Sequence, residues 1–176
     1  MHFGHKGIIG LCNRPFDSVE EMDNTLINNW NATVRREDEI YILGDIFWCK
    51  GEQAKAYLSV LSGKKYLVVG NHDKFLRDFG EIDGWFEWVK DYAVVNYNGV
   101  KLVLFHYPIA EWDGFYKGAI HLYGHVHQSK IASLWTPSNI RAFNVGVDVC
   151  DFSPISINEV IMRANKMAVT GGFIAE

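Results

Sequence analysis

The sequence predicts a layered α/β or α+β domain in which strands and helices alternate along the chain. Short apolar runs typical of strands are separated by segments with helical spacing of apolar residues, and the chain contains no repeat or low-complexity tract. A length of 176 residues suits one domain with a sizeable core. We therefore expect a single domain over residues 1–176.

Three helices are predicted from their start and stop signals. Ser18 and Glu21 form a capping box, in which an N-cap serine is followed three residues later by glutamate. This box opens a helix over about residues 19–33, with apolar residues at helical spacing. The other two predicted helices cover 52–61, ended by Gly63, and 157–166, opened by the capping box Ser156 to Glu159.

Strands are predicted from short apolar runs bounded by turn residues. The dipeptide Asn98-Gly99 favours a type I′ turn, so the flanking segments 92–97 and 101–105 are expected to form a β-hairpin. The other predicted strands are 39–44, 66–70, 120–123 and 142–147.

Composition excludes several classes of protein. The fractions of hydrophobic (48%) and charged (22%) residues are those of a globular domain, and no segment has the roughly 20 apolar residues of a membrane span. A net charge of −4 argues against a basic nucleic-acid-binding face. No secretory signal is recognised, and the three cysteines form no CxxC pair, so free thiols and a cytoplasmic location are expected.

Polar side chains that can bind metals follow four of the predicted strands. Asp45, Asn71, His106 and His125 each stand just after a short apolar run. Ligands gather at strand ends in open α/β sheets. Three of these residues also follow a glycine, which permits a sharp turn and a close backbone approach.

Taken singly, each of these residues has a plainer interpretation as a turn residue, a helix cap or a core histidine. Their joint order favours a dinuclear metal site, which needs histidine and carboxylate ligands from separate elements and one carboxylate between the two ions. His125 and His127 are two residues apart, so in an extended segment their side chains share a face. His2 and His5 add further imidazoles at the N-terminus.

This order of motifs resembles the calcineurin-like metallophosphoesterase superfamily, and within it the small bacterial and phage phosphoesterases. The resemblance runs from His2 to about Val160. It is carried by His2–His5, Asn13–Phe16, Gly44-Asp45, Gly70-Asn71-His72-Asp73, His106, Gly124-His125-Val126-His127 and Phe143–Asp148.

The resemblance implies both a fold and an activity. The fold is a four-layer sandwich of two packed mixed β-sheets flanked by helices, with the site at one edge. The activity is phosphomonoester or phosphodiester hydrolysis by metal-activated water, without a covalent enzyme intermediate. The implied cofactors are two divalent ions of Mn, Fe, Zn or Ni, because mixed nitrogen and oxygen sites accept any of these. The implied substrate is a phosphate-ester small molecule or a nucleotide.

The resemblance also implies residue roles. His72 is the catalytic residue, which stabilises a phosphoryl oxygen or protonates the leaving oxygen. If His72 has an orienting partner, Asp73 or Asp148 must serve, with a plain turn or cap residue as the alternative for each. Asp73 is expected to cap the helix that follows. The implied metal ligands are His2 and His127 at the first ion, Asn71, His106 and His125 at the second, and Asp45 at both.

One departure concerns the N-terminus. The family's first motif has an aspartate two residues before its histidine, and that position would precede Met1. The domain is thus expected to lack the family's first strand. Either the native chain begins upstream, which the rest of the match favours, or it begins here. In both cases the first metal site is one carboxylate short and is predicted to be the weaker.

Arg14 and His5 are candidates for contacts with the substrate. Arg14 is a candidate for a bidentate grip on phosphate, with a solvated loop arginine as the alternative, and His5 is a candidate phosphate contact. Exposed aromatic residues would fit a base-stacking platform or a homodimer surface, although core packing is the commoner role. These aromatic residues are Trp85, Phe86, Trp88, Trp112, Phe115, Tyr116 and Trp135, of which 112–116 is the preferred functional segment.

Two other functions stay open. A metallophosphoesterase fold that has lost ligands can serve as a protein-interaction module, and the absent aspartate favours that alternative. The same metal chemistry would also allow a nuclease, which the acidic net charge disfavours.

Overall fold

The structure, a computed structural model, describes residues 1–129 and 140–167, which form two β-sheets and several helices. The first sheet has the order β1-β2-β3 and is wholly parallel, whereas the second has the order β4-β5-β6-β7 and is mixed. The prediction of two mixed sheets is therefore wrong for the first sheet within the described residues. The strands are β1 (Glu39–Leu43), β2 (Lys64–Val68), β3 (Trp88–Lys90), β4 (Tyr92–Tyr97), β5 (Val100–Phe105), β6 (Ile120–Tyr123) and β7 (Ala142–Asn144).

The helices lie largely where the capping signals predict them. Ser18 Oγ accepts a hydrogen bond of 3.1 Å from the backbone N–H of Glu21, and Ser156 Oγ accepts one of 3.2 Å from Glu159. The α-helices are α1 (Lys6–Leu11), α2 (Val19–Thr33), α3 (Gly51–Val60) and α5 (Ile157–Asn165), and the 3₁₀ helices are η1 (Lys74–Arg77), η2 (Phe115–Lys117) and η3 (Val147–Val149).

Several elements differ from the prediction. Strand β2 covers 64–68 instead of 66–70, and the short helices η2 and η3 were not predicted. Helix α1 was not expected because it holds two glycines and its N-cap residue, His5, makes no side-chain cap; burial of Ile8 in the core holds it in place. Strand β3 has only three residues and depends on its pairing with β2. Strand β7 ends earlier than predicted, at Asn144, whose side chain accepts a hydrogen bond from the Gly146 N–H and turns the chain.

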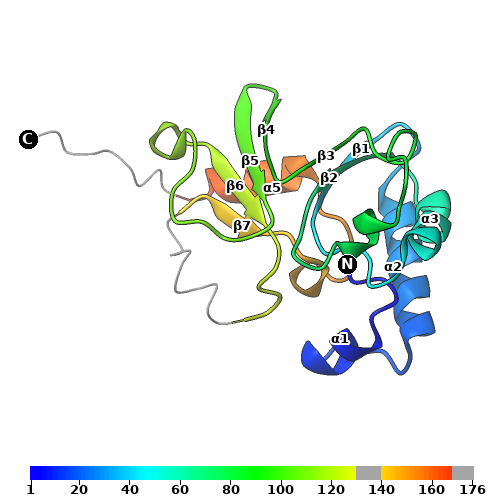
Figure 1. The fold of residues 1–176 in the computed structure, drawn as a ribbon. Coiled ribbons are helices and arrows are strands. Elements are labelled where there is room, and N and C mark those ends of the chain that lie inside the picture. Colours follow the sequence, from blue (N-terminus) through cyan, green and yellow to red (C-terminus); the bar gives the residue numbers. More distant parts are fainter. Residues whose placement is uncertain (130–139, 168–176) are drawn as a thin grey trace, which may run out of the picture.

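Alternate residues of β1 and β2 face two different cores. Ile42 and Leu67 point toward α2 and α3, where the largest buried cluster includes Trp30. Leu43 and Val68 point the other way, into a cluster with β5, β6 and α5. In Figure 1, α2 and α3 accordingly lie beyond the first sheet, on the side away from β4–β7. The loops that follow β1, β2, β5 and β6 meet where the two sheets adjoin.

The aromatic segment preferred for function contributes Trp112 to the core, whereas Tyr116 is 47% exposed. Trp112 is 7% exposed, packs with Val103 and Ala119, and donates from Nε1 to the Ala119 carbonyl. The base-stacking role suggested for it is therefore wrong. Trp135 lies outside the described residues. Within those residues, no helix has the length and apolar character needed to span a membrane.

Candidate metal centre

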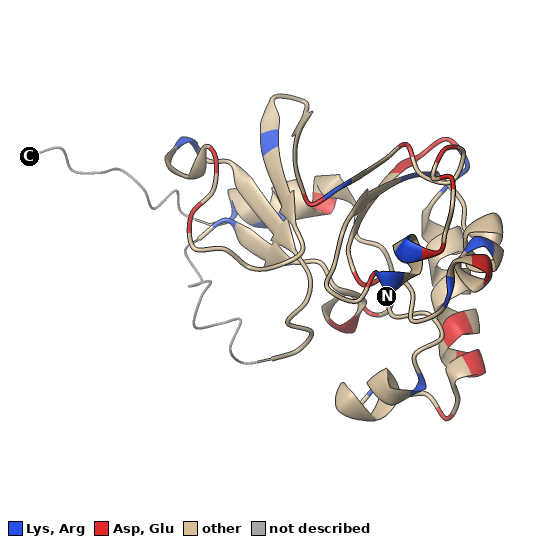
Figure 2. Ribbon diagram, in the orientation of Figure 1, with Lys and Arg blue, Asp and Glu red and all other residues tan. Residues whose placement is uncertain are grey.

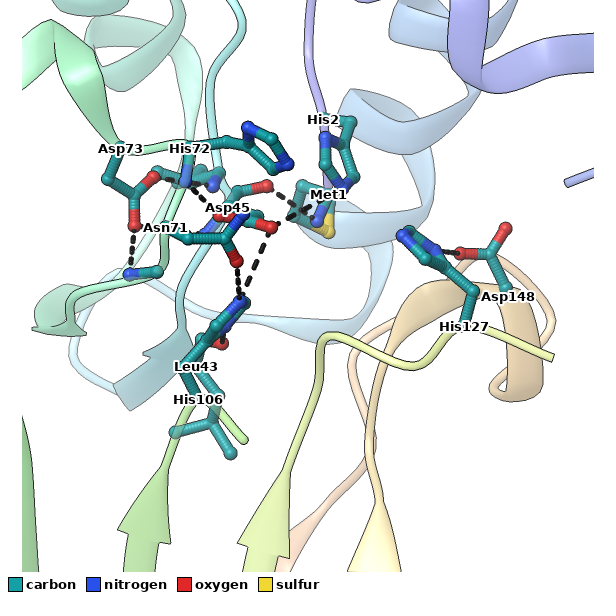
Figure 3. A network of polar contacts seen from close by, with 12 residues as sticks. Met1, His2, Leu43, Asp45, Asn71, His72, Asp73, His106, His127 and Asp148 are labelled. Carbon is teal, nitrogen blue, oxygen red and sulfur yellow. Dashed lines mark hydrogen bonds and ion pairs between the residues drawn. The ribbon is translucent and has the colours of Figure 1, made fainter. Parts of the chain in front are cut away.

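Five segments of the chain meet at one site (Figure 3). Asp45 follows β1, Asn71 follows β2, His106 follows β5, and His125 and His127 follow β6. The N-terminal segment lies along the loop after β1, because the N–H groups of His2 and Phe3 donate to the carbonyls of Asp45 and Ile46, both at 2.9 Å. All six predicted metal ligands therefore approach one region, from five separate segments.

Two glycines allow the loops after β1 and β2 to touch. A Cβ atom on Gly44 would overlap Nδ1 of His106, and Gly44 has φ +83°. A Cβ on Gly70 would lie 2.5 Å from the backbone nitrogen of Asp45. A side chain at either position would push Asp45 and His106 apart, so glycine here serves a close backbone approach.

Backbone strain is concentrated at the same place. His2, Asp45, His125 and His127 all have positive φ, between 46° and 66°. This conformation is uncommon for residues other than glycine and typically costs about 1–3 kcal/mol each. Four of the eight described non-glycine residues with positive φ are thus predicted metal ligands, which supports a functional rather than a structural origin of the strain.

The hydrogen bonds of His106 leave its other ring nitrogen aimed at oxygen atoms. Nδ1 lies 2.7 Å from the Leu43 carbonyl, which can only accept, so Nδ1 carries the proton and donates. Nε2 then presents a lone pair 3.0 Å from Asn71 Oδ1 and 3.3 Å from Asp45 Oδ2. Three electron-pair donors that face one another repel unless a cation or a proton lies between them.

Asp45 lies between two groups of imidazoles. Its Oδ2 is 3.3 Å from Nε2 of His106 and 3.8 Å from Nε2 of His2, while Oδ1 accepts a hydrogen bond of 2.7 Å from the backbone N–H of His72. Burial raises the pKa of Asp45 and the hydrogen bond from the His72 N–H lowers it, and the net shift is below the ordinary value. The carboxylate is therefore ionised at neutral pH.

Neighbouring histidines are held neutral. Burial and the nearby N-terminal amine lower the pKa of His2 to about 2, and burial followed by His106 lowers the pKa of His125. Nδ1 of His2 is buried and has no hydrogen-bond partner. Neutral imidazole beside an ionised carboxylate is the protonation state that metal ligation requires.

The ligands of each predicted ion site lie close together. Ligand atoms of Asp45, His106 and His125 all lie within 4.8 Å of one another. His2 and His127 are neighbours, with ring centroids 5.1 Å apart. Imidazole and carboxylate donors in this arrangement suit a divalent transition metal.

Asp73 does not touch the His72 ring. Its carboxylate accepts three backbone hydrogen bonds, from Gly70 at 2.7 Å and from Asp45 and Ile46 at 2.9 Å each. It stands at the N-cap of η1 but makes no side-chain cap. The predictions that Asp73 caps a helix or orients His72 are therefore wrong, and Asp73 instead ties together the loops after β1 and β2.

Asp148 does not contact His72 either, and Arg14 does not face substrate. Arg14 is buried, with a side chain 1% exposed, and binds Asp148 through Nε (2.8 Å) and Nη2 (3.0 Å). Asp148 Oδ2 also lies 2.7 Å from Nδ1 of His127. The substrate-binding role predicted for Arg14 is wrong because its guanidinium is enclosed and engaged.

Cys12 lies near His127 and Asp148, with ligand atoms within 4.8 Å of one another. This group is a poorer metal site than the one around Asp45. Both oxygens of Asp148 already accept from Arg14, whose positive charge occupies the place of a cation. All three cysteines are free thiols, as expected.

His5 joins the site through an aromatic contact. Its ring stacks on Trp48 at 3.9 Å with an interplanar angle of 7°, and lies 5.5 Å from the His2 ring. Trp48 is 42% exposed and also contacts His72, with centroids 4.7 Å apart. Sequence reasoning missed Trp48, although its place three residues after Asp45 was the available signal.

Two further residues were missed. Asp23 is buried on α2 and accepts hydrogen bonds from the Gly4 N–H (3.0 Å) and the Tyr57 hydroxyl (2.7 Å), which holds the turn between His2 and His5. Tyr107 is 36% exposed, and its ring centroid lies 4.6 Å from that of His125. Neither residue stands in a motif that marks it from sequence.

Comparisons with known proteins identify relatives over most of the chain. Uncharacterized protein MJ1445 of Methanocaldococcus jannaschii is 36% identical over 168 residues, covering 94% of this chain and 88% of that protein. The gene 66 protein of mycobacteriophage L5 is 31% identical over 175 residues, covering 84% and 83%. A similar protein from phage D29 is 30% identical over 176 residues, covering 84% of each chain.

A solved structure has the same fold. The protein of unknown function AQ665 from Aquifex aeolicus is 26% identical, with a TM-score of 0.72 over 92% of this chain and 94% of that one. No family model matches the sequence. These similarities cover most of the chain, and the chain therefore belongs to the family of uncharacterized protein MJ1445 and the mycobacteriophage gene 66 proteins.

Proposed function

We propose that this protein is a metal-dependent phosphoesterase of the calcineurin-like metallophosphoesterase superfamily, with two divalent ions held by the residues that meet after β1, β2, β5 and β6. One observation carries the proposal. The Leu43 carbonyl fixes the His106 tautomer in which Nε2 has a lone pair. In that tautomer Nε2 faces two other electron-pair donors, Asp45 Oδ2 and Asn71 Oδ1. A cation accounts for that arrangement without a further proton.

The residues present fit such ions. Neutral imidazoles, one ionised carboxylate and one amide oxygen make a mixed nitrogen and oxygen donor set, which suits Mn, Fe, Zn or Ni. His2 supports a second ion on the other side of Asp45, since Nε2 faces the same carboxylate oxygen. When bound, the ions supply Lewis-acid activation of water and neutralise charge on the phosphoryl oxygens.

The chain's own groups would position the reaction. The N–H of His72 fixes one oxygen of Asp45, so the carboxylate keeps its place between the two imidazole groups. The His72 ring is half-buried beside Trp48, and its Nδ1 has no hydrogen-bond partner. We propose that His72 contacts the phosphoryl or leaving oxygen, and that His5 lines the same face.

The wider fold proposal is the four-layer sandwich of this superfamily. Support comes from two sheets that share a core between them and from helices α2 and α3 on the outer face of the first sheet. The motif order along the sequence supports the same assignment.

A small phosphate ester fits better than a nucleic acid. Within the described residues, Lys and Arg are distributed over separate elements rather than gathered in a stripe (Figure 2). The net charge is −4. Proteins that bind nucleic acid through its phosphate backbone typically have a basic patch or stripe on their surface.

The test is turnover of p-nitrophenyl phosphate and bis(p-nitrophenyl) phosphate by Mn²⁺-loaded protein and by Asp45→Asn. We expect the variant to lose about 100-fold or more, because several kcal/mol of transition-state stabilisation depends on the ions. Asp113→Asn is the matched control, since Asp113 is an exposed carboxylate paired with Lys101. Equal rates for wild type and Asp45→Asn would overturn the proposal. No turnover with Mn²⁺, Fe²⁺, Zn²⁺ or Ni²⁺ would favour a protein-interaction module.

A further inference from the structure

Arg14 connects segments that are far apart in the chain. Its Nε and Nη2 hold both oxygens of Asp148, and its Nη1 donates to the Met1 carbonyl at 3.0 Å. Nη1 also lies 3.3 Å from Sδ of Met22. The guanidinium therefore bridges the backbone next to His2 and the η3 segment that carries Asp148.

Stability alone does not explain a buried ion pair of this kind. Desolvating two charges can cost more than their attraction returns, and a well-packed apolar replacement is often neutral or stabilising. Such a pair is better explained by a requirement for a defined geometry. Here Arg14 holds the Asp148 carboxylate in a defined position and orientation.

Asp148 in turn determines how His127 presents its ring. Nδ1 of His127 lies 2.7 Å from Oδ2 of Asp148, so that nitrogen carries the proton and Nε2 keeps a lone pair. The loop is held at two further points, because Asn144 Nδ2 donates to the His127 carbonyl and Gln128 Nε2 donates to the Asp148 carbonyl. Figure 3 shows the His127 ring between Asp148 and His2.

We infer that Arg14 is a positioning residue for the His2 and His127 half of the site. It fixes Asp148, which selects the His127 tautomer with Nε2 free for a metal, and it fixes the backbone that carries His2. The inference rests on the proposed function, which supplies the metal ion. It does not involve substrate binding or a metal ion bound at Cys12. Outer partners of this kind typically change metal affinity by about 10–100-fold.

The first experiment needs no metal and no activity. Long-range ¹H–¹⁵N spectra of chelator-treated protein, with His127→Gln to assign the signal, report which ring nitrogen of His127 is protonated. We expect the Nδ1–H form in wild type and a mixture of tautomers in Arg14→Met. An Nε2–H form in wild type, or an unchanged Nδ1–H form in Arg14→Met, would overturn the inference.

The second experiment titrates Mn²⁺ calorimetrically. Arg14→Met is expected to bind one ion as wild type does and to bind the other at least tenfold more weakly. Arg163→Met is the matched control, because Arg163 forms a surface ion pair with Glu159 and should leave both affinities unchanged. Unchanged affinities in Arg14→Met would count against the inference.

A second variant covers misfolding. If Arg14→Met fails to fold, Asp148→Asn is measured instead. Its amide has one acceptor oxygen in place of two, so the NH₂ group must face either Arg14 Nε or the pair formed by Arg14 Nη2 and His127 Nδ1. If wild type binds no Mn²⁺, the proposed function fails, and the tautomer spectra still decide the role of Arg14.

Discussion

The backbone N–H of His72 donates a hydrogen bond of 2.7 Å to Oδ1 of Asp45. This contact ties the loop after β2, which carries the proposed catalytic imidazole, to the carboxylate proposed to lie between two ions. Asp73 reinforces the same junction from behind, because it accepts from the N–H groups of Gly70, Asp45 and Ile46. The relative position of His72 and Asp45 is therefore set by backbone contacts rather than by flexible side chains.

Replacing Asp73 should destabilise the protein strongly. Asp73→Ala leaves three buried N–H groups without an acceptor, at about 1–3 kcal/mol each, so the free energy of unfolding should fall by about 3 kcal/mol or more. Asp73→Asn keeps one acceptor oxygen and should lose less. Urea denaturation of chelator-treated protein measures both, and a loss below about 1 kcal/mol in the alanine variant would contradict the assignment.

Adding one methyl group at Gly70 should disable the site. Its Cβ would lie 2.5 Å from the Asp45 nitrogen and 2.9 Å from Cε1 of His106. Displacement of these groups by about 1 Å should lower Mn²⁺-dependent turnover about 100-fold. Gly10→Ala is the control, because no atom beyond its chain neighbours and its own helix backbone lies within 4 Å of its Cβ position. Wild-type kinetics in Gly70→Ala would refute the close approach of the two loops.

Metal should stabilise the folded protein in a concentration-dependent manner. A free Mn²⁺ concentration 100-fold above the dissociation constant adds about 2.7 kcal/mol, which corresponds to a rise in Tm of about 5 °C or more for a chain of this size. Asp45→Asn should lose this rise and Asp113→Asn should keep it. Differential scanning calorimetry with and without EDTA provides the measurement, and equal shifts in the two variants would argue against Asp45 as a ligand.

Stability without metal should decline as the pH falls through about 6.5. Burial lowers the pKa of His121, against the raising effect of the Val103 and Tyr107 carbonyls. Below about pH 6.5 His121 therefore binds a proton in the unfolded chain but stays neutral in the folded chain. Stability is complete above the unfolded pKa and is lost on acidification, by up to about 1.4 kcal/mol per pH unit for each such group.

His121→Gln isolates that contribution, since His121 lies in the core outside the site. The remaining slope comes in part from His2, His5 and His125, whose pKa values burial also lowers. Urea unfolding between pH 7 and pH 5 in EDTA should give a shallower slope for the variant. An identical slope would mean that His121 is protonated in the folded state.

Local sequence signals predicted most elements of the fold. The capping serines Ser18 and Ser156 and the Asn98-Gly99 turn act within a few residues, so their effects can be read without the fold. Helix α1 and strand β3 escaped prediction because neither has strong local propensity, and burial of Ile8 and pairing with β2 decide them.

The sequence by itself determined that Asp45, Asn71, His106 and His125 meet at the site, because each stands just after a strand and strand ends converge in such sheets. Tertiary structure alone decided the tasks of Arg14, Asp73 and Asp148. Arg14 and Asp148 bind atoms from distant segments, and Asp73 binds backbone N–H groups. Nearly every residue has a backbone N–H group, so such contacts cannot be recognised in a sequence pattern. The same holds for Trp48, whose place beside His5 and His72 depends on how three loops pack.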